Sequence, residues 1–212
     1  MLPLGGKARS AKGAVMSSAY EVPIFPLNTV LFPGGVLPLK IFEQRYMAMT
    51  SECMREEKPF GVCLIAQGRE AGQPALPHAV GVEARIVDWD MQQLGVLHLT
   101  TRGGRRFRII DSAVDRDGLR RARVEPIADE PPQAVPESLQ NLLNLLREIV
   151  AEVGVERIPE PHDYADAVWA GYRYCEVLPI PLAARQKLLE LDDAISRLEI
   201  VQQFLRQRGL AD

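Results

Sequence analysis

The chain has 212 residues, of which 47% are hydrophobic and 25% charged, and its formal net charge is −3. This composition is ordinary for a soluble globular protein, and the length suits one large domain or two small ones. The slightly acidic balance gives no global sign of nucleic-acid or membrane binding, and no apolar run reaches the roughly 18 residues of a spanning helix.

The first residues carry no regular pattern. Residues 1–19 are rich in Gly, Ala and Ser and lack the continuous apolar core of a signal peptide. They predict a disordered leader, in which Met16 is an alternative to Met1 as the start. Three widely spaced cysteines indicate buried thiols in a reducing compartment. Together these features favour a cytoplasmic protein.

Residues 20–128 are predicted to be rich in β-strands, because short apolar runs alternate with strand-breaking Gly, Pro and Asp. The predicted strands are Val22–Pro26, Val36–Ile41, Phe60–Gln67, Val80–Asp88, Gly95–Arg102, Arg105–Ser112 and Leu119–Ile127. Gly103-Gly104 is interpreted as a hairpin turn between two of them. So many short strands in a region of this length predict a small closed or nearly closed barrel.

One helix is predicted among these strands, over residues 43–57, and Pro59 ends it. Apolar residues recur at helical spacing and predict its buried face, which consists of Phe42, Tyr46, Met49 and Cys53. The simplest interpretation of this aromatic and sulfur stripe is core packing.

A proline-rich linker over residues 129–136 separates the strands from a helical region over residues 137–212. Apolar residues at helical spacing predict four helices in that region. Asp163 is predicted to cap the second, Pro181 to begin the third, and Asp192 or Asp193 to cap the fourth. The predicted fold class is α+β, with a β-barrel over residues 20–128 followed by a C-terminal α-helical bundle.

The stretch from Ile24 to Tyr46, IFPLNTVLFPGGVLPLKIFEQRY, closely resembles the opening of the amino-terminal substrate-recognition domain of Lon proteases. Further matching segments lie at residues 60–62, 80–86, 105–109 and 178–190, so the resemblance covers about residues 20–208. It implies a PUA-like β-barrel followed by a helical bundle, in a standalone and non-proteolytic relative. In Lon proteases this region helps to capture unfolded or tagged protein substrates.

An ATPase or peptidase centre is not predicted within these residues. The sequence contains no GxxxxGK[ST] phosphate loop and no Ser in the glycine-flanked peptidase setting. His78, His98 and His162 lie far from one another and from the cysteines, so no metal site is predicted. No catalytic residue and no cofactor is therefore assigned. A hydrolase that uses Lys40 in a Lys-Thr-Glu arrangement is a weaker alternative, because no Thr follows Lys40 at close spacing.

The leading hypothesis is a protein-binding module for unfolded or tagged polypeptides, which it would hold or deliver to a protease or chaperone. Its expected surface lies near the loop at residues 31–33 and the groove between barrel and bundle. Phe32 and Tyr46 are the predicted apolar contacts, and Arg45 and Arg106 the predicted polar ones. Glu43 and Arg45 are also expected to pair at the start of the helix. The oligomeric state is not specified by the sequence.

Residues 102–123 contain eight arginines and only three aspartates. Residues 125–212, by contrast, contain eight basic and sixteen acidic residues. RNA binding through an Arg102–Arg123 hairpin is the alternative hypothesis. The negative overall charge and the few interleaved aromatic residues argue against it. The same arginines also fit an exposed strand face that is attracted to the acidic helices.

Overall fold

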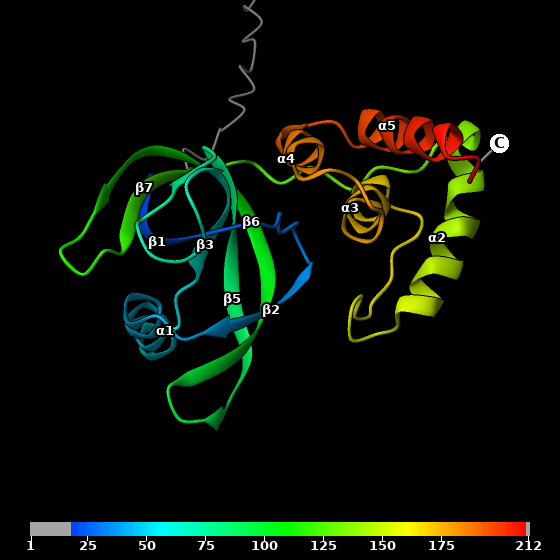
Figure 1. Cartoon of the computed structure of the whole chain (residues 1–212). Helices are drawn as coiled ribbons and strands as arrows, with labels where there is room; N and C mark the ends of the chain where they lie inside the picture. Colours follow the sequence, from blue (N-terminus) through cyan, green and yellow to red (C-terminus); the bar gives the residue numbers. More distant parts are fainter. Residues whose placement is uncertain (1–17, 211–212) are drawn as a thin grey trace, which may run out of the picture.

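We describe residues 18–210 of the computed structural model (Figure 1). The strands are β1 (Tyr20–Leu27), β2 (Val36–Ile41), β3 (Phe60–Gln67), β4 (Leu76–Pro77), β5 (Val80–Gln93), β6 (Val96–Val114) and β7 (Arg120–Pro126). The helices are α1 (Gln44–Glu56), α2 (Gln140–Val153), α3 (Ala167–Val177), α4 (Leu182–Glu190) and α5 (Ala194–Gln207), with a 3-10 turn η1 (Glu137–Leu139) before α2. The architecture is mixed α and β. The predicted leader at residues 1–19 lies almost wholly outside the described residues.

The strand pairings form a closed circuit that begins and ends at β1. β1 pairs antiparallel with β7 and parallel with β3, and the order β7-β6-β5-β3 connects these two partners. β6 is the longest strand, with 19 residues, and it pairs with β5, β2 and β7. Figure 1 shows the β5–β6 and β6–β7 hairpins as two arms that project from the strand region, while α2 to α5 lie together on its other side.

Gly103 and Gly104 do not form the predicted hairpin turn, because both lie inside the uninterrupted strand β6. A side chain at Gly103 would collide with the backbone carbonyl oxygen of Phe32, so glycine is required here for the close approach of two backbone segments. The turns of the β5–β6 and β6–β7 hairpins contain Gly95 and Gly118 instead, with φ angles of 83° and 84°. These left-handed angles favour glycine.

Helix α1 agrees with its predicted bounds to within one residue at each end. Tyr46, Met49 and Cys53 are buried, which confirms most of the predicted apolar face. Phe42 is the exception, since it precedes the first helical residue and is 59% exposed. The direction of the Phe42 side chain is set by the segment that precedes α1, so helical spacing does not predict which way it points.

Helix α3 begins later than predicted. Asp166, not Asp163, is its N-cap, and the Asp166 carboxylate accepts hydrogen bonds from backbone N–H groups of the first turn. The same carboxylate accepts the backbone N–H of Gln133 at 2.9 Å, which ties the segment at residues 129–136 to α3. A local sequence pattern could not predict this contact, because the two residues are 33 positions apart. Asp193 caps α5, as one of the two predicted residues.

A buried ionic cluster joins the strands to the helices. Glu130 is 8% exposed, and its carboxylate accepts hydrogen bonds from the Tyr172 hydroxyl at 2.6 Å and from the Arg197 guanidinium at 2.6 and 3.2 Å. Arg106 of β6 lies 3.5 Å from this carboxylate and donates to two backbone carbonyl oxygens at the end of α4. Arg106 also pairs with Asp192 at 2.9 Å. Because buried charges are costly unless they are paired, these contacts link the helices to β6 alongside the apolar core that both regions share.

Candidate functional site

The four residues that were predicted to contact a bound protein are all buried. Phe32, Arg45, Tyr46 and Arg106 are 0, 7, 5 and 3% exposed. Phe32 packs against the ring of Tyr172 with centroids 5.7 Å apart, and Arg106 belongs to the ionic cluster around the helices. In this conformation the four side chains make contacts inside the folded chain. Their direct contact with a partner stays a prediction.

Arg45 and Tyr46 anchor helix α1. Arg45 pairs with Glu43 at 2.9 Å, as expected from the sequence, and donates to the carbonyl oxygen of Gly118 at 3.3 Å. Tyr46 stacks on Phe25 of β1 with ring centroids 4.0 Å apart. The spacing of these residues in the sequence is therefore explained by packing of α1 against β1 and the β6–β7 turn.

The arginines between residues 102 and 123 have different roles. Arg121 binds Glu52 of α1 through two hydrogen bonds of 3.1 and 2.6 Å, and Arg120 donates to the backbone carbonyl oxygen of Ala75 at 3.2 Å. Five of the eight are exposed, namely Arg102, Arg105, Arg108, Arg116 and Arg123. The β6–β7 hairpin thus carries exposed positive charge, but part of its predicted charge serves internal contacts.

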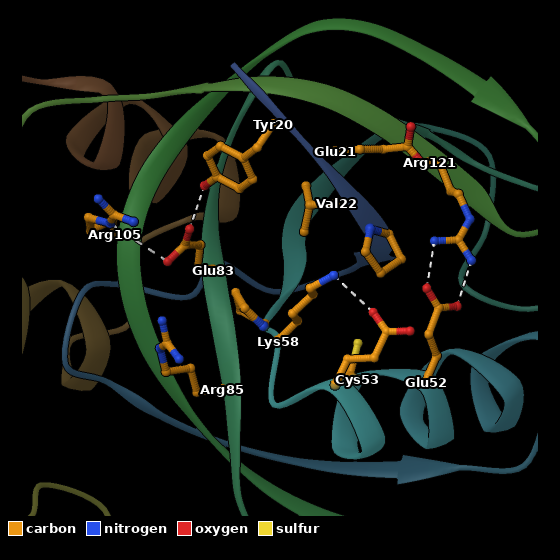
Figure 2. Close-up of a pocket in the computed structure, with 13 residues that line it drawn as sticks. Tyr20, Glu21, Val22, Glu52, Cys53, Lys58, Glu83, Arg85, Arg105 and Arg121 are labelled. Carbon is orange, nitrogen blue, oxygen red and sulfur yellow. Dashed lines mark hydrogen bonds and ion pairs between the residues drawn. The ribbon is translucent and has the colours of Figure 1, made fainter. Parts of the chain in front are cut away.

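A hollow of about 540 Å³ opens between β1, α1, β5, β6 and β7 (Figure 2). Its charged side chains mostly contact one another. Lys58 pairs with Glu56 at 2.9 Å, and the pair of Arg121 and Glu52 lines another side of the hollow. The Tyr20 hydroxyl donates to the carboxylate of Glu83, which is 3% exposed and lies 3.9 Å from the Arg105 guanidinium. The hollow is therefore polar and internally braced.

Two groups in this hollow, Tyr20 and Cys53, have pKa values above their ordinary values. Burial and the hydrogen bond to Glu83 raise the pKa of Tyr20 above its ordinary value. Burial raises the pKa of Cys53 to about 11. A phenol and a thiol with raised pKa values are weak nucleophiles at neutral pH. This geometry favours non-covalent binding in the hollow. Cys53, Cys63 and Cys175 are all buried and free, as predicted from their spacing.

Four exposed apolar side chains lie toward the tip of the β5–β6 hairpin. Val87, Trp89, Met91 and Leu94 are 58, 52, 40 and 95% exposed, and we call them the hairpin patch. They lie beyond the residues of β5 that pair with β3. Grouped apolar side chains that remain in water mark interaction sites.

The sequence interpretation missed the hairpin patch because it ended this strand at Asp88, whereas β5 runs to Gln93. The available signal was the alternation of Val, Trp and Met with two aspartates over residues 87–91. Such alternation predicts a strand with one buried face. Only the fold shows that no described element covers the apolar side chains.

The hairpin patch continues into a second hollow of about 420 Å³, which lies between the end of α1 and β5 and which we call the edge groove. Met54 of α1 and Val87 and Trp89 of the patch line it. The edge groove shares Cys53, Lys58 and Arg85 with the hollow in Figure 2. An apolar surface and a charged hollow are thus adjacent along one side of β5.

Within residues 18–210, no helix has the length and hydropathy that a membrane crossing requires. The same residues contain no group of three His, Cys, Asp or Glu side chains placed to hold a metal ion. Lys40, which was considered for a hydrolase, is exposed on β2.

Residues 21–207 match the family model described as the ATP-dependent protease La (LON) substrate-binding domain. The chain is 29% identical over 204 residues to the Lon protease of Anaeromyxobacter dehalogenans (strain 2CP-C), which covers 88% of this chain and 23% of that protein. It is 30% identical over 194 residues to the Lon protease of Methylocella silvestris, with 84% and 23% covered. The chain therefore spans less than a quarter of the length of these two relatives.

Two solved structures are similar to this one. A Lon N-terminal domain protein from Xanthomonas campestris superposes with a TM-score of 0.73 at 34% identity, covering 88% of this chain and 98% of that one. The N-terminal domain of Mycobacterium avium complex Lon protease shares the fold, with a TM-score of 0.62 at 18% identity. The mixed α and β fold is that of Lon N-terminal domains, and the chain belongs to the Lon substrate-binding domain family.

Proposed function

We propose that this chain binds unfolded or tagged polypeptides without chemically altering them, and that the hairpin patch is the surface that contacts them. The observation that carries the proposal is the exposure of Val87, Trp89, Met91 and Leu94 on one projecting hairpin. An unfolded polypeptide displays apolar side chains that a folded protein hides, and these side chains complement such a patch.

The residue types in the patch suit a binder of varied sequences. Trp supplies a large contact area and is enriched among residues that dominate binding energy. Met is flexible and polarizable, so it adapts to partners of different shape. Trp89 and Met91 stand two residues apart on β5, and Leu94 lies at the turn. Together they offer a rigid aromatic contact beside adaptable aliphatic ones.

Membership of the family supports a role in substrate recognition. The finer features of the fold and of that role belong to this proposal. We infer that the circuit of strand pairing is the expected PUA-like barrel and that α2 to α5 form the expected helical bundle. The division into residues 20–128, 129–136 and 137–212 follows from this inference. A cytoplasmic location and delivery of bound chains to a protease or chaperone belong to the same proposal.

The proposal is tested by measuring binding of an unfolded model protein, such as reduced and carboxymethylated lactalbumin, by fluorescence anisotropy. Wild-type protein is expected to bind the unfolded form more tightly than the native form. A Trp89→Ala, Met91→Ala variant is expected to lose affinity, whereas Phe42→Ala, which removes an aromatic ring that is 59% exposed elsewhere, is the matched control. Equal affinity of all three proteins would place the binding surface elsewhere.

RNA binding through the exposed arginines of β6 and β7 is the second candidate. Arg102, Arg105, Arg108, Arg116 and Arg123 supply the positive charge for it. If several phosphates are contacted, the affinity for a single-stranded RNA should fall steeply as salt rises. A filter-binding titration that detects no complex at low salt would exclude this candidate.

A further inference from the structure

One edge of β5 is open beside the hairpin patch. β3 pairs with β5 only from Val82 to Ala84, and Pro59 immediately precedes the first pairing residue of β3. Proline has no N–H to continue the ladder, and the chain turns there toward α1. From Arg85 to Gln93 the backbone of β5 pairs with β6 alone among the described residues. The register of β5 against β6 shifts between Ile86 and Asp88 and again between Asp90 and Gln93, so the unpaired donors and acceptors on the other edge form an interrupted row.

An open strand edge is a template for another extended chain. The edge of β5 lies beside the edge groove, so an added strand would find room between β5 and the end of α1. Val87 and Trp89 line this groove and would contact its apolar side chains. The free edge of β2 is less suitable, because Pro38 lies in the middle of that six-residue strand and lacks a donor.

The charge at the inner end of the edge indicates an acidic group on the partner. Arg85 faces Arg102 directly across the β5–β6 ladder, and both are exposed. Like charges in this position repel each other. Neither guanidinium has an ion-pair partner among the described residues, and Arg85 lines both the edge groove and the hollow in Figure 2. A carboxylate placed there would relieve the repulsion.

We propose that the edge of β5 from Arg85 to Gln93 takes up an extended apolar segment of a bound polypeptide as an additional β-strand, with an Asp or Glu side chain of that segment against Arg85. This inference rests on the proposed function and adds the binding mode and the substrate class. It selects segments in which an acidic residue flanks alternating apolar residues, because successive side chains of a strand point to opposite faces.

The binding mode is tested with short synthetic peptides that carry alternating Val and Leu residues and one terminal Glu. Both placements of Glu are measured, because strand direction decides which end reaches Arg85. The tighter peptide is then N-methylated at every second residue, in one phase or in the other. One phase removes the donors that face β5 and should weaken binding at least about tenfold, while the other phase should retain it.

The charge is tested by exchange. An Arg85→Glu variant should bind the Glu peptide about tenfold more weakly, and a peptide with Lys in place of Glu should recover the loss. The Arg85 side chain makes no hydrogen bond or ion pair with another described residue, and its backbone pairing with β6 does not depend on the side chain, so this variant is expected to keep its fold. Lys40→Glu, on the open edge of β2, is the matched control and should leave both affinities unchanged.

The outcomes separate the two proposals. If the parent peptide binds and both methylated phases bind equally well, strand addition is wrong while the hairpin patch remains a binding surface. If Arg85→Glu and the Lys peptide show independent effects, the acidic contact at Arg85 is wrong. If neither the peptide nor an unfolded protein binds, the proposed function fails, and this inference fails with it.

Discussion

The ionic cluster around Glu130 and the hairpin patch differ in which kind of side chain is exposed to solvent. At the cluster, charged groups are almost completely buried, with Glu130 8%, Arg106 3% and Arg197 0% exposed, and they bind one another. At the patch, apolar groups stay in water, and Leu94 is 95% exposed. In each place the usual arrangement of polar outside and apolar inside is reversed.

The two reversals have different consequences. Charges buried between strands and helices are stable only as a complete set, so the cluster should affect folding strongly. Exposed apolar side chains bury little surface within the chain, so the patch should affect folding weakly and binding strongly. The difference indicates that one region maintains the structure and the other is free to bind.

The largest expected effect on stability comes from Glu130→Ala. The substitution leaves Arg197 buried without its carboxylate partner, while Arg106 keeps its ion pair with Asp192 at 2.9 Å. The uncompensated charge on Arg197 should lower the free energy of unfolding by about 3–5 kcal/mol. Glu148→Ala, at an exposed position of α2, is the control and should change it by less than about 0.5 kcal/mol. Urea denaturation followed by circular dichroism measures both. Equal stabilities would show that the cluster does not maintain the interface.

A smaller loss is expected from Gly103→Ala. The new methyl group would collide with the carbonyl oxygen of Phe32, so the backbone must shift, at a cost of roughly 1–3 kcal/mol. Gly104→Ala is the neighbouring control, because its nearest contacts are side-chain atoms of Glu83 at 3.3 Å, whereas a methyl group at Gly103 would lie 2.1 Å from a backbone oxygen. Thermal unfolding of the two variants ranks them. A larger loss for Gly104→Ala would contradict the assigned role of Gly103.

The third expected effect depends on pH. Burial raises the pKa of Glu176 from 4.5 to about 7, against the attraction of Arg173, Arg157 and Arg185, which lowers it. The folded state therefore binds this proton more tightly than the unfolded state. The free energy of unfolding should fall as pH rises from about 4.5 to about 7, by on the order of 2–3 kcal/mol from this group.

Glu176→Gln should remove that part of the pH dependence. Gln keeps the shape of the side chain but does not titrate, so the slope between these pH values should become smaller in urea denaturation series. Glu148→Gln, in an exposed part of α2, should leave the slope unchanged. If the Glu176 and Glu148 variants show the wild-type slope alike, another group causes the pH dependence.

The smallest effect on stability is expected at the patch. Trp89→Ala should lower the free energy of unfolding by no more than about 1 kcal/mol, because the side chain is 52% exposed and only part of its apolar surface is buried. Affinity for an unfolded protein should nevertheless fall about tenfold. Calorimetry of unfolding and anisotropy titrations on the same sample compare the two. A large loss of stability without loss of affinity would reverse the roles that we assign to the cluster and the patch.

Local patterns in the sequence predicted most of the elements. The run from Val36 to Ile41 is the strand β2 with the predicted bounds, and the predicted cap at Asp193 begins α5. The resemblance over residues 24–46 indicated the family that the match over residues 21–207 confirms. The predictions of elements succeed because turn residues, caps and apolar spacing act over a few neighbouring residues.

The candidate site was harder to predict. Arg106 and Phe32 were expected on a binding surface, yet both are buried against elements that follow them by several tens or by more than a hundred residues. Conversely, Trp89 belongs to an alternating pattern that also fits a half-buried strand. Sequence spacing shows which side chains share a face, but it does not show whether another element covers that face.

The sequence by itself determined the mixed strand and helix content, the family and the bounds of β2, β3 and α1, because these depend on local propensity and spacing. Only the tertiary structure decided that Gly103 serves a close backbone contact, that Glu130 gathers cations from β6 and α5, and that β5 extends past the end of its pairing with β3. Those features arise from contacts between segments far apart in the chain. Their energies depend on which surfaces meet and which remain in water.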